Sequence, residues 1–370
     1  MRGLTRPAKR AGEMAFNAGG GAVNWFPGHM AAASRAIRDR LKLADLVIEV
    51  RDARIPLSST NEDLQPVLSA KRRILALNKK DVANPNIMTR WLNHFESCKH
   101  DCISINAHSS SSVSQLLGLA ELKLKEAISK EPTLLIMVVG VPNVGKSALI
   151  NSIHRIANSR FPVHDKIKRA TVGPLPGVTQ DIAGYKIASQ PSIYVLDTPG
   201  VLVPSIPDME TGLKLALTGA VKDSVVGEER IAKYLLSLLN IRKTPLHWER
   251  LLHRREDLYE ETCSSNENNS RDSLRRGRRM NNSDALYVQD LVMEVQRTLC
   301  STFLDFTGNT QEESELESLI DMQLMALRKV FRIPHKPFDE THGPTSKKLL
   351  TLFRAGKLGP FILDDLPDER

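Results

Sequence analysis

The sequence predicts an α/β fold: a doubly wound, mostly parallel sheet, followed by an all-helical C-terminal domain. Up to about residue 205, short apolar runs alternate with helical stretches, and a polar loop follows each run. That alternation is typical of a parallel sheet covered by helices. Beyond residue 208 the apolar residues recur at helical spacing. The chain has 370 residues and 41% hydrophobic content, which is enough for two cores.

The expected strands of the first domain are short and strongly apolar. They cover residues 46–50, 73–77, 103–105, 134–139 and 193–196. Helices are expected at 31–43, at about 113–129 and from residue 146 onward. Ligands of a doubly wound sheet bind beyond the carboxyl ends of its strands, so the residues after each strand are the place to look for a site.

The second domain is predicted from two helical repeats of apolar residues. They are Leu291, Val292, Val295, Leu299 and Phe303, and then Leu316, Leu319, Ile320, Leu324, Leu327 and Phe331. Residues 254–284 are rich in Asn, Ser and Arg, which predicts a disordered insertion. We therefore divide the chain into a basic tail (1–22), a first domain (23–205) and a helical domain (206–370).

Charge and composition limit the class of protein. The net charge of +8 favours an anionic partner such as nucleic acid or a membrane surface, although it also fits a plain basic protein. The longest apolar run, 134–141, is far shorter than the roughly 20 residues of a membrane span, so we expect no transmembrane segment. The four cysteines form no zinc set and are expected as free thiols. The tail is either an organellar targeting segment or a disordered basic stretch.

A phosphate-binding loop follows the strand at 134–139. The chain reads Gly-x-x-x-x-Gly-Lys-Ser from Gly140 to Ser147 and then enters a helix, which is the context that this motif requires. Lys146 is expected to neutralise the β- and γ-phosphates, and Ser147 to bind Mg²⁺. The residues expected around the nucleotide are Asn143, Val144, Gly145, Lys146, Ser147 and Ala148.

Two further elements are expected at the γ-phosphate. Asp197 closes a strand in Asp-Thr-Pro-Gly, where its carboxylate would hold Mg²⁺ through water and the N–H of Gly200 would contact the γ-phosphate. A loop at 171–181 lies between this motif and the phosphate loop, and its Thr179, rather than Thr171, is the predicted threonine that closes on Mg²⁺ and the γ-phosphate.

A guanine-reading loop follows the strand at 73–77. The carboxylate of Asp81 can accept hydrogen bonds from N1–H and the exocyclic amine of guanine, a donor pair that adenine lacks. The motif comprises Asn78, Lys79, Lys80 and Asp81. Lys79 is expected to lie along the base and Asn78 to brace the loop. A candidate second guanine loop, whose backbone N–H would meet O6, contains Ser104, Asn106 and Ala107. GTP and GDP are therefore the predicted ligands.

The order of these motifs is unusual. The guanine loop comes first, then the second guanine loop, the phosphate loop, the switch threonine and Asp-Thr-Pro-Gly. Common GTPases begin with the phosphate loop, so residues 23–205 are predicted to be a circularly permuted P-loop GTPase domain. The switch at 197–201 then leads directly into the helical domain, and we expect contacts of Gly200 with the γ-phosphate to reposition that domain.

The permuted order combines with three sequence features: Arg51-Asp52-Ala53-Arg54, the segment 25–30 (Trp-Phe-Pro-Gly-His-Met) and the segment 353–359. Together they resemble the circularly permuted DAR GTPases of the ribosome biogenesis GTPase A type, whose organellar members are mitochondrial ribosome-associated GTPases. The resemblance implies GTP hydrolysis coupled to maturation of a large ribosomal subunit, with the helical C-terminal domain binding rRNA. We expect a monomer that binds the large-subunit precursor in the GTP state and leaves after hydrolysis. It implies a location in the mitochondrial matrix or at the matrix face of the inner membrane; plastid and cytosol remain alternatives.

The resemblance also bears on catalysis. Val201 stands where Ras-like enzymes have the glutamine that orients water. The family pattern implies that His29 takes this role once the ribosomal particle is bound; alternatively, His29 is a structural residue of the turn. Lys146 and Thr179, with the phosphate and Mg²⁺ roles given above, complete the predicted catalytic residues. Asn143 resembles the asparagine through which related GTPases use K⁺.

Two other functions remain open. One is a membrane-associated regulatory GTPase with peripheral contact through the basic tail, although the chain ends without a prenylation box. The other is a GTP-binding RNA scaffold with negligible hydrolysis, which Val201 suggests.

Overall fold

The computed structural model describes residues 23–24, 28–128, 130–160, 183–189, 192–201, 205–206, 208–248, 282–334 and 342–367. The chain divides into two compact units. The first contains the described residues of Gly21–Val226 and Gly359–Arg370, and the second contains those of Gly227–Leu358.

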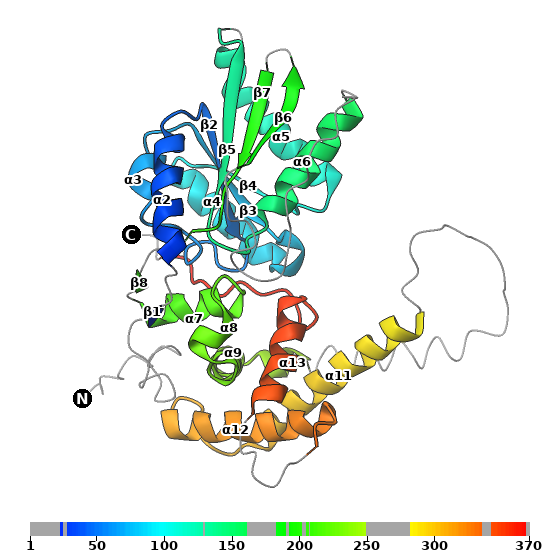
Figure 1. Ribbon diagram of the computed structural model, residues 1–370. Coiled ribbons are helices and arrows are strands. Elements are labelled where there is room, and N and C mark those ends of the chain that lie inside the picture. The colour runs from blue at the N-terminus through cyan, green and yellow to red at the C-terminus, as the bar shows by residue number, and fades with distance from the viewer. Residues whose placement is uncertain are drawn as a thin grey trace, which may run out of the picture. The chain divides into compact units, whose positions relative to one another are not determined.

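A six-stranded sheet with the order β4-β3-β2-β5-β7-β6 forms the centre of the first unit (Figure 1). Its strands are β2 (Leu46–Asp52), β3 (Arg73–Asn78), β4 (Asp101–Ser104), β5 (Thr133–Val139), β6 (Ala183–Ser189) and β7 (Ser192–Asp197). All neighbouring pairs are parallel except β6 and β7. The mostly parallel sheet is confirmed, and each predicted strand is present. The edge strand β6 was not predicted, because its sequence mixes small and polar residues and has no apolar run.

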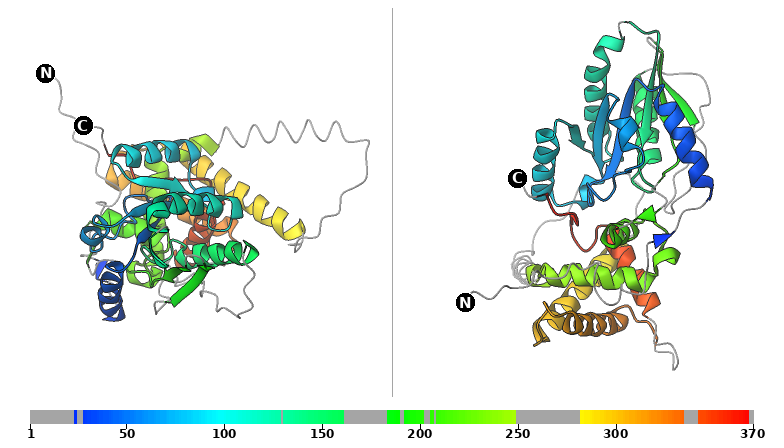
Figure 2. Two further views of the ribbon diagram at one scale, coloured as in Figure 1. Left: turned by 90° about the horizontal axis from the view of Figure 1, so that it is seen from above. Right: turned by 90° about the vertical axis from the view of Figure 1, so that its left-hand side faces the viewer.

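Helices cover both faces of this sheet (Figures 1 and 2). The helices α2 (Gly28–Leu41), α3 (Gln65–Leu68) and α4 (Pro85–Ser97) lie on one face, where apolar residues of β2, β3 and β5 form two clusters with them. The opposite face carries α5 (Ser110–Ile128) and α6 (Lys146–Arg160). The helix predicted at 31–43 begins three residues earlier and ends at Leu41.

The sequence explains the position of α4. Asn84 caps the helix, because its side chain accepts hydrogen bonds from the backbone N–H groups of Asn86 and Ile87. Met88, Trp91 and Phe95 then recur at helical spacing and are buried against β3.

The strand order has a topological switch point between β2 and β5. From β2 the chain adds β3 and β4 on one side, and later it adds β5 and β7 on the other. Crevices that bind ligands form where the strand order reverses in this way. The residues that follow β2 and β5 therefore flank the place where such a crevice is expected.

Further elements belong to the first unit. The strands β1 (Val23–Asn24) and β8 (Ser205–Ile206) pair antiparallel, and α7 (Met209–Leu217) and α8 (Asp223–Val226) follow. The first compact unit thus continues past the boundary at residues 205–206 that the sequence suggested, and it also takes up the end of the chain.

The regular elements in the described part of the second unit are helices. Its helices are α9 (Glu228–Ile241), α11 (Asn282–Asp305), α12 (Glu313–Val330) and α13 (Gly343–Arg354). The helix α12 contacts the other three. Two buried amides, Asn240 and Gln323, exchange hydrogen bonds of 2.9 Å between α9 and α12. Since α11 begins at Asn282, the last three residues of the predicted insertion are helical; its residues 254–281 and the tail 1–22 lie outside the described residues.

The expectation of free thiols is met at Cys98, Cys102 and Cys300. In the described part of the chain, none of the helices is long and apolar enough to cross a membrane.

Candidate guanine-nucleotide site

The parallel strands end at one edge of the sheet, and the polar motifs follow there. Asp52 ends β2, Asn78 ends β3, Ser104 ends β4, Gly140 follows β5 and Asp197 ends β7. Residues that are far apart in sequence therefore meet on either side of the switch point between β2 and β5.

The phosphate loop has the backbone conformation that its glycines predict. Gly140 and Gly145 have φ values of 151° and 96°. A Cβ atom at Gly140 would collide with the backbone oxygen of Val50, and one at Gly145 would collide with Nδ2 of Asn78. Asn143, between them, also has a positive φ of 58°. Only glycine fits at positions 140 and 145. The loop ends at Lys146, where α6 begins, so the N–H groups of the loop lie at a helix N-terminus.

Lys146 is buried within this loop, where its Nζ donates a 3.0 Å hydrogen bond to the backbone oxygen of Val141. Burial lowers the pKa of Lys146 to about 8; Asp197 opposes this change and Lys79 adds to it. A buried ammonium group with this environment is better stabilised by anionic oxygens, such as those of a phosphate.

Two oxygen donors for a hard cation lie beside the lysine. Ser147 Oγ donates a 3.0 Å hydrogen bond to Oδ2 of Asp197. Oδ1 of Asp197 is buried and has no hydrogen-bond partner in the described structure. Burial raises the pKa of this carboxyl above its ordinary value. A hydroxyl and a carboxylate oxygen are ligands that Mg²⁺ prefers, so the residues present fit this ion.

The residues after Asp197 lie against the phosphate loop. Thr198 donates a 2.7 Å hydrogen bond from Oγ1 to the backbone oxygen of Val138 in β5. A Cβ atom at Gly200 would lie 2.5 Å from Cα of Pro142 and 3.0 Å from Nζ of Lys146. Gly200 is therefore in contact with the phosphate loop, as its predicted role requires.

Val201 lies in the core. Its side chain is 1% exposed and belongs to the cluster that contains Ile37 and Leu41 of α2 and Met137 of β5. Its backbone oxygen accepts a 2.8 Å hydrogen bond from Nδ2 of Asn61. An apolar side chain in this position cannot orient a water molecule. It also connects the end of the switch to α2, the helix whose first turn contains His29.

Asn78 joins the guanine loop to two other loops. Its Nδ2 donates a 2.7 Å hydrogen bond to the backbone oxygen of Val144 in the phosphate loop. Its Oδ1 accepts a 2.9 Å hydrogen bond from the backbone N–H of Ala107 in the second guanine loop. Lys80 N–H adds a 3.1 Å bond to the backbone oxygen of Ile105. The structure thus brings the predicted base-reading and phosphate-binding residues together.

The second guanine loop is anchored from both sides. The backbone oxygen of Ala107 accepts a 2.5 Å hydrogen bond from Ser152 Oγ of α6. The backbone N–H of Asn106 donates a 3.0 Å hydrogen bond to Ser112 Oγ of α5. Oδ1 of Asn106 accepts a 2.8 Å hydrogen bond from the backbone N–H of His108. Asp81, by contrast, is exposed on the short 3₁₀ helix η2 (Lys80–Val82), where a base can reach it.

Two predicted residues are not placed. His29 is in the first turn of α2, but its side chain lies outside the described residues, and so does Thr179 with the rest of 171–181. Sequence reasoning also missed two residues that contact these loops: Asp52, which lies 2.9 Å from Nζ of Lys79, and Gly219, whose backbone oxygen accepts a 3.3 Å hydrogen bond from Asn143. Arg51-Asp52-Ala53-Arg54 was noticed, yet Asp52 was given no role, although it ends a strand as the other motifs do. Gly219 carries no local signal.

The comparisons with known proteins identify the family. Residues 135–262 match the family model described as 50S ribosome-binding GTPase. The chain is 65% identical over 359 residues to Short integuments 2, mitochondrial, of Arabidopsis thaliana, covering 96% of this chain and 93% of that protein. It is 39% identical over 347 residues to DAR GTPase 2, mitochondrial, of the same organism, covering 92% and 90%. The chain belongs to the DAR GTPase family.

Membership of the DAR GTPases confirms the predicted resemblance and GTP hydrolysis as the activity. The mitochondrial localisation is borne out by the same relatives. The chain is also similar to GNP-bound YlqF from T. maritima, with 19% identity and a TM-score of 0.46, over 89% of this chain and 95% of that one.

Proposed function

We propose that this DAR GTPase is an assembly factor for the large subunit of the mitochondrial ribosome, which binds rRNA in its GTP state and is released after hydrolysis. Two relatives support the ribosomal partner by name. They are Ribosome biogenesis GTPase A of Bacillus cereus, 37% identical over 224 residues and 71% of that protein, and Mitochondrial ribosome-associated GTPase 1 of Bos taurus, 41% identical over 226 residues and 66% of that protein.

One observation carries the mechanism: the motifs that bind GTP are assembled, whereas the residue after Asp-Thr-Pro-Gly is a core valine. Such a site can hold GTP and lacks the usual means to activate water. An enzyme of this kind hydrolyses GTP slowly until another group is supplied. A ribosomal precursor that completes the site would couple hydrolysis to correct assembly.

The arrangement of the loops supports the proposed nucleotide roles. Asp81 would read N1–H and the amine of guanine, and a backbone N–H of the second guanine loop would meet O6. Lys146 leaves the oxygen of Val141 and neutralises the β- and γ-phosphates, while the loop N–H groups bind the remaining oxygens. Lys146→Ala should abolish nucleotide binding, and Asp81→Asn should shift the preference from guanine to xanthine nucleotides.

Mg²⁺ is expected between Ser147 and Asp197, with Thr179 closing on it from the switch loop. Ser147 Oγ would exchange its bond to Asp197 for the ion. When bound, Mg²⁺ neutralises charge on the β- and γ-phosphates. Gly200, which touches the phosphate loop, is placed to report whether the γ-phosphate is present.

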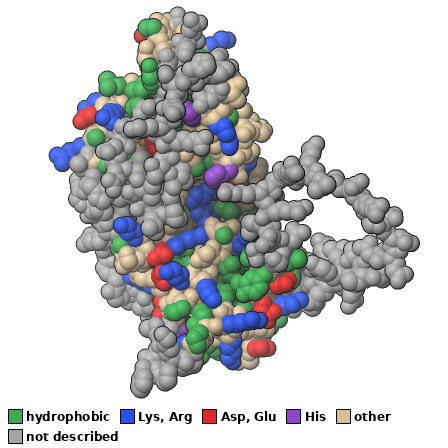
Figure 3. Space-filling model, turned by 45° about the vertical axis from the view of Figure 1, so that its right-hand side comes forward, with side chains coloured by type: hydrophobic (Ala, Val, Ile, Leu, Met, Phe, Trp, Pro, Cys, Tyr) green, Lys and Arg blue, Asp and Glu red, His purple; other side chains and the backbone are tan. Residues whose placement is uncertain are grey.

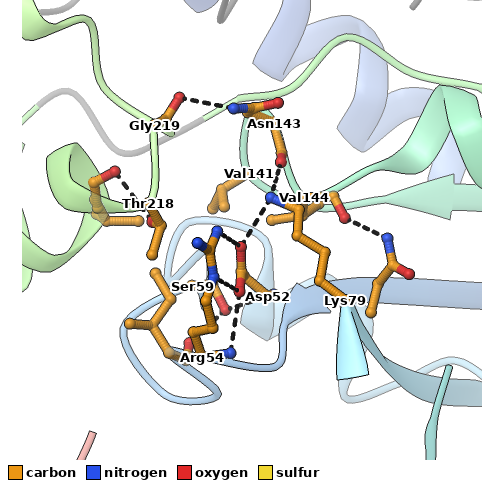
Figure 4. Close-up of polar contacts among 12 residues, drawn as sticks. Asp52, Arg54, Ser59, Lys79, Val141, Asn143, Val144, Thr218 and Gly219 are labelled. Atoms are coloured by element: carbon orange, nitrogen blue, oxygen red, sulfur yellow. Dashed lines mark hydrogen bonds and ion pairs between the residues drawn. The ribbon is translucent and has the colours of Figure 1, made fainter. Parts of the chain in front are cut away.

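K⁺ is the proposed second cation, at Asn143. Its Nδ2 donates a 3.3 Å hydrogen bond to the backbone oxygen of Gly219 (Figure 4), so the amide is oriented by the turn that follows α7. The carbonyl oxygen of the same amide is the atom that a monovalent cation would use. This cation would supply positive charge near the phosphates in place of an arginine.

His29 is the proposed residue that orients the attacking water. Its helix α2 packs on Val201 through Ile37 and Leu41, so a change at the switch reaches the helix that carries the histidine. We infer that binding to the ribosomal precursor brings His29 to the γ-phosphate.

The second unit supplies the proposed RNA contacts. Lysine and arginine side chains lie among apolar ones on its surface (Figure 3). At the junction of α12 and α13, the exposed basic residues are Lys329, Arg332, Lys347 and Lys348. Such side chains bind phosphates without reading sequence, and their affinity falls with salt.

GTP turnover tests this proposal. It should be slow for the protein alone and rise by about two orders of magnitude or more with a large-subunit precursor in K⁺ buffer, with less stimulation in Na⁺. Unstimulated turnover with tight precursor binding would instead indicate an RNA scaffold. Sedimentation with liposomes but not with the precursor would indicate a membrane-associated GTPase. Equal affinity of the precursor for the GTP and GDP states would contradict the coupling between nucleotide and RNA.

A further inference from the structure

Asp52, the acid of Arg51-Asp52-Ala53-Arg54, lies at the centre of the nucleotide loops without being one of their motif residues. It is the last residue of β2, directly at the topological switch point, and it is 2% exposed. A buried carboxylate is costly unless charged or hydrogen-bonding partners surround it. Its partners therefore show what it does.

One set of partners belongs to its own loop. Arg54 donates to both carboxylate oxygens, from Nε to Oδ1 at 3.0 Å and from Nη2 to Oδ2 at 2.8 Å. The backbone N–H of Arg54 adds a third bond to Oδ1 at 3.0 Å, and the backbone N–H of Asp52 donates 3.1 Å to Ser59 Oγ. These bonds fix the carboxylate in one orientation and would suffice for a purely structural role.

The other partner is the lysine of the guanine loop. Nζ of Lys79 lies 2.9 Å from Oδ2 of Asp52, and the same Nζ donates a 2.7 Å hydrogen bond to the backbone oxygen of Asn143 (Figure 4). The backbone of Lys79 has a φ of 67° in the guanine loop, and its side chain places Nζ between β2 and the phosphate loop. The ammonium group thus joins three segments at one point.

The charges make this contact depend on Asp52. Arg54 and Lys79 are two cations beside one anion. Burial lowers the pKa of Lys79, Asp52 raises it, and Arg54 lowers it further. If the carboxylate lost its charge, only the weaker effect of Asp81 would offset the repulsion between Lys79 and Arg54, and that repulsion would favour movement of the Lys79 amine towards solvent. The bond to the Asn143 oxygen would then be lost.

We propose that Asp52 is a positioning residue that holds Lys79 along the guanine base and against the phosphate loop, and so sets the lifetime of the bound nucleotide. This inference rests on the proposed assignment of Asn78–Asp81 to guanine. It assigns Asp52 of the Arg51-Asp52-Ala53-Arg54 motif a defined partner, Lys79, in the loop that follows β3. It also makes Asn143, at the left-handed turn of the phosphate loop, dependent on a carboxylate outside the set of residues expected to contact the nucleotide.

The test uses the full chain with a fluorescent GDP analogue. Asp52→Asn keeps the size of the side chain and removes its charge, and it should speed GDP release about tenfold or more and raise KM for GTP with little change in kcat. Lys79→Met should have a similar effect. In the double variant the two effects should not add, because Asp52 acts through Lys79.

Glu49→Gln is the matched control. Glu49 lies on the same strand, is also 2% exposed, and is ion-paired with Arg51 at 2.7 Å and Arg73 at 3.1 Å, yet no described contact joins it to a nucleotide loop. It should lower the melting temperature and leave GDP release unchanged. Asp52→Glu, which keeps the charge and displaces the carboxylate, should also speed release and serves if Asp52→Asn does not fold.

Three results would overturn the proposal: release by the Asp52 variants within twofold of the unmodified protein, additive effects of Asp52→Asn and Lys79→Met, or equal acceleration by Glu49→Gln. The Asp81→Asn variant distinguishes a failure of this inference from a failure of the proposed guanine site. If Asp81→Asn switches base preference while Asp52 has no effect, only the present inference fails. If Asp81→Asn leaves base preference unchanged, the guanine assignment fails.

Discussion

Asp364 accepts a 2.6 Å hydrogen bond from the hydroxyl of Ser58, a residue 306 positions earlier in the chain. The same carboxylate accepts backbone hydrogen bonds from Leu57 at 2.8 Å and Ser58 at 2.9 Å, and it lies 3.3 Å from Nζ of Lys214 in α7. The end of the chain is thereby bound to the loop that follows Arg51-Asp52-Ala53-Arg54.

Other contacts extend this attachment to the guanine loop. The backbone N–H of Phe361 donates a 3.2 Å hydrogen bond to the backbone oxygen of Val82. The backbone N–H of Leu363 donates a 2.7 Å hydrogen bond to the backbone oxygen of Arg54. Ile362 is buried in the cluster with Trp91 of α4. The residues after α13 therefore pack against the base-reading loop and help to hold it in place.

Asp364→Ala should destabilise the first unit. It would leave two backbone N–H groups without their acceptor and the largely buried Lys214 with Glu210 as its remaining ion-pair partner, at a cost of about 3 kcal/mol in the free energy of unfolding. For a unit of this size the melting temperature should fall by about 6–12 °C in scanning calorimetry. Asp365→Ala, at the exposed neighbouring position, should change it little. Equal effects of both substitutions would mean that the carboxylate of Asp364 does not hold the segment.

Gly200→Ala should impair hydrolysis more than GDP binding. The new Cβ would lie 2.5 Å from Cα and 2.7 Å from N of Pro142, and backbone atoms cannot yield as a flexible side chain can. Gly200 must then move away from the phosphate loop, and misplacement on this scale can cost about 100-fold in turnover. GDP lacks the γ-phosphate, so its affinity should be retained. Gly118→Ala in α5, where a Cβ meets nothing within 4 Å, is the control. Normal turnover by the Gly200→Ala variant would show that Gly200 does not act in the switch.

His29→Ala should separate catalysis from binding. GTP affinity should be kept, because the base and phosphate loops do not involve α2, while turnover stimulated by the precursor should fall about 100-fold. Single-turnover hydrolysis with and without the precursor measures both. Arg35→Ala, exposed on the same helix, should behave as the unmodified protein. Full stimulated activity without the imidazole would support the alternative that His29 only shapes the turn.

Acid should weaken the fold in part through Asp52. Burial would raise the pKa of Asp52, but the charges of Arg54 and Lys79 outweigh it and hold that pKa below its ordinary value. Asp81 acts on the same two cations. Because the folded pKa is the lower one, the stabilisation is complete above the unfolded pKa of about 4 and is lost as the pH falls below it.

The melting temperature of Asp52→Asn should therefore lie below that of the unmodified protein at pH 7, and the difference should shrink as the pH falls from about 4 towards 2. Thermal unfolding monitored at several pH values checks this. A constant difference across that range would show that Asp52 does not titrate with folding.

Local sequence predicted much of the fold and of the site. The strands at 46–50, 73–77, 103–105, 134–139 and 193–196 were found because strands buried in a parallel sheet are continuous apolar runs. The loops after them were found because phosphate and guanine recognition need fixed residue types at fixed spacing. The edge strand β6 was missed, since an edge strand need not be apolar on both faces.

The sequence by itself determined the permuted motif order, the glycines at Gly140 and Gly145, and the absence of a glutamine at Val201, because each depends on residue type at a given position. Only the tertiary structure decided that Lys79 lies between Asp52 and Asn143, that Val201 packs on α2, and that Asp364 closes on Ser58. Those contacts join segments that are distant in the chain, and their geometry is set by how the strands align and the helices pack, which no local pattern records.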